Sequence, residues 1–197
     1  MTRRIVPIVE GQSEVESVPD FLRRVLHDRG VFDLEVDRPI REHRQKLVKD
    51  EVFLKRVRMA QYRANCTAVI VVFDADDDAA CEVGPHLCEL VKRNSIAVPT
   101  CVVLAVRELE SWLVAGVDSL RGYRGVPSDL SPPEDPEFKR GAKEWLDQRL
   151  TGGYKETIDQ LPLLHKLDYR AARTRAPSLD KFLRDVDSLV VASVGEP

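Results

Sequence analysis

The chain of 197 residues lacks any long apolar run, although 43% of its residues are hydrophobic. A membrane-spanning helix needs about 18 or more consecutive apolar residues, and no stretch approaches that length. The first four residues, Met1 to Arg4, lead directly into a short apolar segment and not into the longer core of a signal peptide. The sequence therefore predicts a protein that has no membrane span, is not exported and resides in the cytoplasm.

Three further features are scarce. The 30 basic residues do not outnumber the 33 acidic ones, which argues against a uniformly basic nucleic-acid binder, so any contact with a polyanion must be local. The four cysteines form no C-x-x-C pair and are expected to be free thiols; they are Cys66, Cys81, Cys88 and Cys101. No G-x-x-x-x-G-K-[ST] motif is present, so the chain cannot drive ATP-dependent steps by the usual route.

What the chain does contain is a regular alternation of strands and helices. Short β-branched runs at 4–9, 32–37, 67–73 and 100–106 are separated by helical patterns at 13–30, 47–64 and 79–94. Such an order predicts right-handed crossovers and a mostly parallel sheet with helices on both faces. We expect an α/β domain over 1–115, a loop or lid over 116–136, and a helical C-terminal extension over 137–197 packed on the same domain, with one helix over about 135–150.

Four carboxylates end the third apolar run, in Phe73-Asp74-Ala75-Asp76-Asp77-Asp78. An EF-hand loop is excluded, because Ala79 and Pro85 stand where that loop needs Gly and Glu. A solvated acidic loop that caps the next helix and an aspartyl-nucleophile phosphatase remain alternatives. Clustered carboxylates repel one another unless a cation lies among them, which favours a site for Mg²⁺ or Mn²⁺.

Two other acidic segments follow predicted strands. These are Glu10-Gly11-Gln12-Ser13-Glu14 after the first strand and Glu108-Leu109-Glu110-Ser111-Trp112 after the fourth. Each alone is explained by a tight turn or by carboxylates in the first turn of a helix. The carboxyl ends of parallel strands meet at one edge of a sheet, so the fold is expected to gather these acids with those of the third strand.

Together the three segments resemble the Toprim domain, whose metal site combines a Glu after the first strand with Asp-x-Asp after the third. The chain is more closely similar to the DUF4276 group of Toprim-like proteins, related in style to OLD-type and RloB-type nucleases. Two later segments, Tyr154-Lys155-Glu156-Thr157 and Ala176-Pro177-Ser178-Leu179-Asp180-Lys181-Phe182, also match. The resemblance spans nearly the whole chain and implies a Toprim-like α/β fold.

The resemblance also implies roles for particular residues. Glu10, Asp74 and Asp76 would hold Mg²⁺ or Mn²⁺, with Glu110 as a further ligand or a residue that orients water. Phosphodiester hydrolysis requires charge neutralisation and an activated water, which carboxylate-bound metal ions provide. Lys155 and Lys181 are the candidates for a cationic catalytic group near the scissile phosphate.

Two segments carry local positive charge. Nine basic residues oppose three acidic ones over 38–63, and five oppose one over 170–184. Either segment is explained by an ordinary solvated helix face, but phosphate contacts dominate nucleic-acid affinity and favour a binding surface. The predicted nucleic-acid-binding residues are Arg38, Arg41, Arg44, Lys46, Arg173 and Arg175.

The function expected from the residues and the resemblance is that of a metal-dependent nuclease acting on DNA or RNA. Resemblance further implies a role in defence against foreign nucleic acid beside an ATPase partner. Two alternatives stay open. One is a non-catalytic Toprim-like interaction or regulatory module, and the other is phosphoryl chemistry on a small nucleotide.

Overall fold

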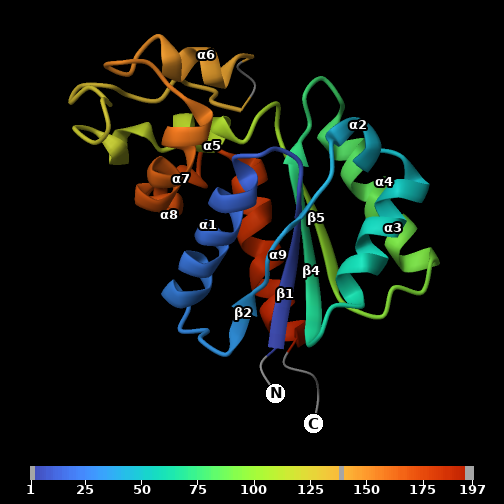
Figure 1. Cartoon of the computed structure of the whole chain (residues 1–197). Coiled ribbons are helices and arrows are strands. Elements are labelled where there is room, and N and C mark those ends of the chain that lie inside the picture. The colour runs from blue at the N-terminus through green and yellow to red at the C-terminus, as the bar shows by residue number, and fades with distance from the viewer. Residues whose placement is uncertain (1–2, 138–139, 194–197) are drawn as a thin grey trace.

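A parallel β-sheet forms the centre of the molecule (Figure 1). The structure is a computed structural model that describes residues 3–137 and 140–193. All strand pairings in these residues are parallel, and the order is β2-β1-β4-β5, with β3 also pairing with β1. The strands are β1 (Arg3–Val9), β2 (Leu34–Val36), β3 (Ile40–Arg41), β4 (Cys66–Asp74) and β5 (Thr100–Ala105). The predicted α/β class with a parallel sheet is confirmed.

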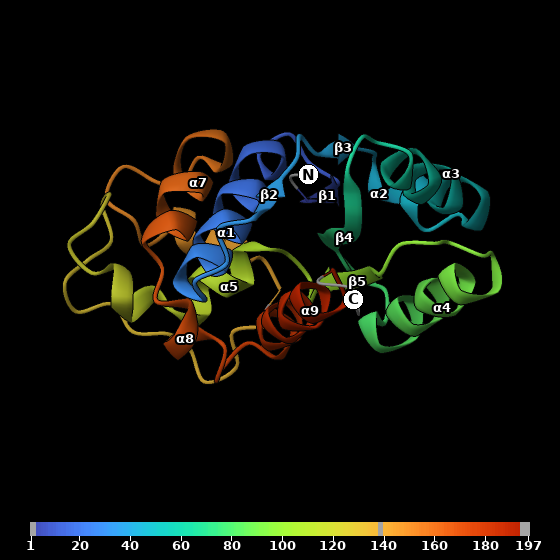
Figure 2. The same ribbon diagram turned by 90° about the horizontal axis from the view of Figure 1, so that it is seen from below.

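Side chains of the central strands alternate between two hydrophobic cores. On β1, Ile5 and Val9 face one core, whereas Val6 and Ile8 face the other. A strand that is buried on both faces becomes a continuous apolar run, which explains the sequence of β4. Figure 2 shows the two helical layers on opposite sides of the strands.

The helices divide between these two layers. One layer holds α2 (Arg44–Leu47), α3 (Asp50–Gln61) and α4 (Ala80–Arg93). The other holds α1 (Glu14–Asp28) and the later elements, which are α5 (Glu110–Ala115), η1 (Val117–Leu120), α6 (Ala142–Asp147), α7 (Glu156–Lys166), α8 (Tyr169–Ala172) and α9 (Pro177–Ser193). Phe182 and Leu183 of α9 belong to the same core as Ile5, so the C-terminal helix packs directly on the sheet.

The start of α9 is fixed by buried hydrogen bonds. The hydroxyl of Ser178 accepts from Trp112 Nε1 at 2.7 Å and from the Val106 amide at 3.3 Å, and it donates to Glu137 at 2.5 Å. Glu137 also accepts from the Ser178 amide at 3.0 Å. These contacts join the segments around 108–112 and 176–182 and place the N-terminus of α9 at the carboxyl edge of the sheet.

Some predicted boundaries were wrong. The helix predicted over 47–64 is present as the shorter α3, whereas α2, which ends at Leu47, and β3 were not predicted. The helix predicted from 135 begins only at Ala142, after Gly141 with φ +72°. Glu137 lies in a turn, and its side chain accepts a hydrogen bond from Ser178. Residues 138–139 of the predicted helix lie outside the described residues.

Among the described residues, no helix is both long and apolar enough to cross a membrane.

Candidate active site

The carboxyl edge of the sheet gathers acids from three adjacent strands. Glu10 follows β1, Asp74 is the last residue of β4, and Glu110 begins α5 just after β5. Because β4 lies between β1 and β5, Asp74 stands between the other two strand ends. The Leu109 amide donates a hydrogen bond of 2.8 Å to Asp74 Oδ1, which fixes that carboxylate against the start of α5.

Glu14, in the first turn of α1, adds a fourth carboxylate. Its side chain folds back over Gly11, where an added Cβ would lie 1.9 Å from Glu14 Oε2. Gly11 is therefore required for this arrangement, because any larger residue would displace the carboxylate. We call Glu10, Glu14, Asp74 and Glu110 the inner carboxylates.

Two polar side chains from the C-terminal part hold the inner carboxylates. The side-chain nitrogen of Gln160 donates to Glu14 Oε1 at 3.1 Å and to Glu110 Oε1 at 3.2 Å. Its side-chain oxygen accepts from Ser17 at 2.6 Å, which fixes the amide orientation. Tyr154 donates its hydroxyl proton to Glu110 Oε1 at 2.9 Å. Glu14 and Glu110 are thus tied to one amide group.

Unpartnered buried oxygens are concentrated at this edge. Among the described residues, the buried side-chain atoms without a hydrogen-bond partner are Glu10 Oε2, Ser13 Oγ, Glu14 Oε2, Glu110 Oε2 and Ser111 Oγ. All five are oxygens, and they come from two short segments that follow β1 and β5. A buried carboxylate oxygen without a donor is costly, so this group of oxygens is suited to accept a cation or its bound water.

Burial and mutual repulsion shift the ionisation of these groups. Burial raises the pKa of Glu10, with the negative charges of Asp76 and Glu14 acting in the same direction. Burial, followed by the charges of Glu110 and Glu14, raises the pKa of Asp74 well above its ordinary value. Burial raises the pKa of Glu110 to about 7, against the opposing charge of Lys143. Perturbed carboxylates grouped at one sheet edge are a recognised feature of functional sites.

Lys143 of α6 supplies positive charge to the inner carboxylates. Its ammonium lies 3.8 Å from Glu110 Oε2 and 3.0 Å from Glu156 Oε2. Although burial alone would lower it, the pKa of Lys143 is raised because Glu110, Glu156 and Asp74 favour the charged form. One ammonium does not balance four carboxylates, so a further cation would relieve the remaining repulsion.

The outer part of the acidic segment is arranged differently. Asp76, Asp77 and Asp78, which we call the outer carboxylates, are exposed and paired with arginines. Arg44 lies 3.3 Å from Asp76 and 2.5 Å from Asp78. Asp77 is paired with Arg107 at 2.7 Å and with Arg140 at 2.5 Å. These carboxylates are already neutralised by the protein.

The residues present fit a hard divalent cation. Within residues 3–137 and 140–193, no three acidic, histidine or cysteine side chains are gathered into a complete metal site. Mg²⁺ usually keeps several waters and binds through one or two carboxylates, so it does not require such a preformed set. The unpartnered oxygens of Glu10, Glu14 and Glu110 are the donors it prefers.

The structure separates the other residues predicted for the site. Lys155 is exposed at the start of α7, and Lys181 pairs with Asp185 at 2.5 Å; neither has a polar side-chain contact with the inner carboxylates in the described part of the chain. Both remain predictions as catalytic residues. Lys143 was not predicted as a site residue, because it lies in none of the segments that resemble the family. Glu14 was not predicted either, although it lies four residues after Glu10 in the same acidic segment, and that spacing was a usable signal for a site residue.

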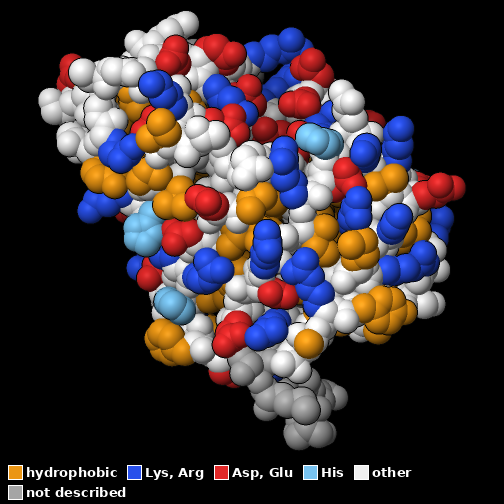
Figure 3. Space-filling view, viewed as in Figure 1, with side chains coloured by type: hydrophobic (Ala, Val, Ile, Leu, Met, Phe, Trp, Pro, Cys, Tyr) orange, Lys and Arg blue, Asp and Glu red, His pale blue; other side chains and the backbone are white. Residues whose placement is uncertain are grey.

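The predicted nucleic-acid-binding residues fall into two places. Arg41 donates to the Glu10 carbonyl at 3.1 Å, and Arg44 donates to the Asp74 carbonyl at 3.0 Å, so both border the acidic edge. Arg38 and Lys46 are exposed nearby in the chain. Arg173 and Arg175, by contrast, pair with Asp180 and Asp118 near α8 and the start of α9. Figure 3 shows basic side chains interleaved with acidic ones over one face of the molecule.

A parallel α/β sheet with carboxylates gathered at its carboxyl edge defines the class: an α/β protein with an acidic site at the strand ends. Within that class the chain belongs to the family described as "Domain of unknown function (DUF4276)", which matches residues 9–187. The matched region includes all four inner carboxylates and Lys143. Comparison with curated proteins and with solved structures found no match in either set.

Proposed function

We propose that the chain is a metal-dependent nuclease that hydrolyses phosphodiester bonds in DNA or RNA. The observation that carries the proposal is the set of unpartnered buried oxygens from Glu10, Glu14 and Glu110 beside Asp74. These carboxylates would repel the scissile phosphate placed against them unless a divalent cation neutralised them. The resemblance to Toprim-like nucleases supports the same chemistry.

Each group at the edge has a role in this proposal. Glu10 and Asp74 would hold Mg²⁺ or Mn²⁺, with Glu14 and Glu110 binding through oxygens or through water. Asp76 remains a predicted ligand, since in this structure it is paired with Arg44. The ion would lower the pKa of a bound water and neutralise charge on the phosphoryl oxygens. Lys143, held by Glu110 and Glu156, would stabilise negative charge that develops on the phosphate. Gln160 and Tyr154 would keep Glu110 in position for both partners.

The proposal extends to the setting in which the protein acts. Resemblance to OLD-type and RloB-type systems supports a role in defence against foreign nucleic acid beside a partner that hydrolyses ATP. The proposed compartment is the cytoplasm, as expected from the sequence. The absence of a phosphate-binding loop in this sequence is consistent with a need for such a partner.

A cleavage assay tests the proposal. Plasmid, single-stranded DNA and RNA are incubated with the wild-type protein in Mg²⁺, in Mn²⁺ and in chelator, alone and with a candidate ATPase partner. We expect metal-dependent cleavage that is lost in Asp74→Asn, which keeps the shape of the side chain and removes its charge. Glu89→Gln is the matched control, since Glu89 pairs only with Arg93 among its described ion pairs. Absence of cleavage under every condition would favour a non-catalytic module.

A further inference from the structure

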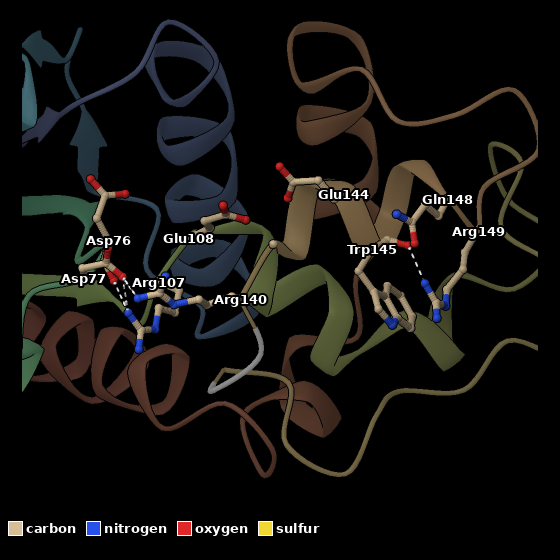
Figure 4. A pocket seen from close by; sticks show the side chains of 10 residues that line it. Asp76, Asp77, Arg107, Glu108, Arg140, Glu144, Trp145, Gln148 and Arg149 are labelled. Carbon is tan, nitrogen blue, oxygen red and sulfur yellow. Dashed lines mark hydrogen bonds and ion pairs between the residues drawn. The ribbon is translucent and has the colours of Figure 1, made fainter.

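Beside the inner carboxylates the surface is hollowed. The cavity has a volume of about 660 Å³ and is lined by two outer carboxylates, by residues of α6 and by three arginines, Arg107, Arg140 and Arg149. Figure 4 shows these side chains, with dashed lines that join Asp77 to Arg107 and Arg140. Its size lies in the range of about 300–1,000 Å³ that is common for ligand sites. We call it the arginine hollow.

The arginine hollow and the inner carboxylates share their supporting segments. Asp76 lies two residues after Asp74, and Glu144 follows Lys143 directly. Glu108, which lines the hollow, accepts a hydrogen bond of 3.0 Å from the Lys143 amide. The hollow and the inner carboxylates therefore lie on neighbouring segments at the carboxyl edge of the sheet.

Arg107 has an unusual backbone conformation and is held in place by hydrogen bonds to Asp76. Arg107 has φ +66° and Asp76 has φ +49°, a conformation that non-glycine residues rarely adopt. The Asp76 amide donates to the Arg107 carbonyl at 3.0 Å, and Arg107 Nη1 donates to the Asp76 carbonyl at 3.1 Å. These reciprocal bonds fix the Arg107 guanidinium at the mouth of the hollow, as expected for a residue that must meet a ligand in a defined position.

The Asp77 carboxylate is bound by two guanidinium groups, in the way that a phosphate oxygen of a ligand would be bound. Its side chain is 73% exposed and is bound by Arg107 at 2.7 Å and by Arg140 at 2.5 Å. An exposed aspartate can rotate into water at little cost, and arginine pairs bind phosphate as readily as carboxylate. The hollow is lined by four carboxylates besides the three arginines. Its aromatic residue, Trp145, is covered, because it is 5% exposed and Arg149 lies over its ring at 4.5 Å.

We propose that Arg107 and Arg140 bind a non-scissile phosphate of a polynucleotide strand, and that the Asp77 carboxylate occupies this position until a strand displaces it. The inference rests on the proposed function, since it places the strand beside the inner carboxylates. It assigns backbone recognition, without reading of base sequence, to residues outside the two basic segments of the sequence.

Binding without metal tests this proposal separately from cleavage. Fluorescence anisotropy is measured in chelator with a labelled single-stranded oligonucleotide of about 12 nucleotides, within the usual range of site sizes. We expect Arg140→Gln to weaken binding about tenfold and to reduce the salt dependence by about one phosphate contact. Asp77→Asn should tighten binding, because it frees both guanidinium groups. Arg93→Gln is the control, since Arg93 is 75% exposed against 73% for Arg140 and pairs with Glu89.

Each outcome separates the two proposals. Equal binding by Arg140→Gln and Arg93→Gln, or weaker binding by Asp77→Asn, would overturn the phosphate assignment, whatever the cleavage assay shows. Competition by a nucleoside 5′-monophosphate as effective as that by the unlabelled oligonucleotide would also overturn it, because the site would then serve a free nucleotide. Arg140-dependent binding by a wild-type protein that never cleaves would support the phosphate site and count against the nuclease.

Discussion

The inner and outer carboxylates lie at the same edge of the sheet but differ in burial and in their positive partners. Asp76 and Asp78 share one arginine and Asp77 has two. Three oxygens of the inner carboxylates have no hydrogen-bond partner, and within the described residues Lys143 forms an ion pair with Glu110 alone among them. Exposed and paired acids are stable without a ligand. Buried acids without sufficient positive charge are maintained at a cost in stability, which is the expected state of a site that awaits a cation. Under the proposed function, the buried group would bind the cation and the exposed group would not.

The largest expected effect concerns the cation already present among the inner carboxylates. If Lys143 stabilises charge on the phosphate, Lys143→Met should reduce cleavage by about 100- to 1,000-fold, the usual loss when one such donor is removed. Initial rates with any nucleic acid that the wild-type protein cleaves measure this effect. Lys155→Met and Lys181→Met are the comparisons, since Lys155 is exposed and Lys181 pairs with Asp185. A greater loss in either of them would return the catalytic role to the lysines expected from the sequence.

A second effect follows from the ionisation of Glu110. Burial raises its pKa from the ordinary 4.5 to about 7 in the folded protein. The folded state therefore binds the Glu110 proton more tightly than the unfolded state does. The contribution of this proton to the free energy of unfolding is fully present below pH 4.5 and is lost as the pH rises through about 7. The pKa difference corresponds to on the order of 3 kcal/mol. Glu110→Gln removes this titration, so its free energy of unfolding without metal should fall less between about pH 5 and about pH 8 than that of the wild type.

Urea unfolding at the two pH values measures the comparison. Glu10 and Asp74 also have raised pKa values, so some pH dependence should persist in the Glu110→Gln variant. Glu89→Gln should keep the wild-type pH dependence. Identical pH dependence in the wild type and Glu110→Gln would show that the Glu110 carboxylate is not strained by burial.

A third, smaller effect concerns Glu14 through Gly11. In Gly11→Ala the added Cβ would meet Glu14 Oε2 and must displace that carboxylate. Because the displaced atoms end a flexible side chain, the loss of stability without metal should stay below about 1.5 kcal/mol. Mg²⁺ at about 100 times its dissociation constant should raise the melting temperature of the wild type by about 5–10 °C, and a tenfold weaker affinity would reduce that rise by about half.

Gly84→Ala is the matched control for Gly11→Ala. Its added Cβ would lie 3.6 Å from Leu104 Cδ1, an ordinary contact, so the response to Mg²⁺ should be unchanged. If Gly11→Ala responds to Mg²⁺ as the wild type does, Glu14 does not belong to the metal site.

The comparison also shows what the sequence could predict. Glu10, Asp74 and Glu110 were predicted because parallel strands end at one edge, and the alternation of strands and helices established that edge. Lys143 and Gln160 were not predicted, since their positions depend on how α6 and α7 pack against α1 and α5 after a long irregular segment. The proposed phosphate site was also not predicted, because Arg107 and Arg140 reach Asp77 only through tertiary structure.

The smallest effect is expected at the outer carboxylates. Asp78 pairs with Arg44, but that guanidinium also donates to the carbonyls of Asp74 and Ala75 at 3.0 and 2.8 Å. In Asp78→Asn these backbone bonds should hold Arg44 in place, so the free energy of unfolding should change by less than about 1 kcal/mol, as for most exposed ion pairs. The Mg²⁺-induced rise in melting temperature should equal that of the wild type. A loss of the Mg²⁺ response as complete as in Asp74→Asn would mean that the cation binds among the outer carboxylates, and the distinction between the two groups would fail.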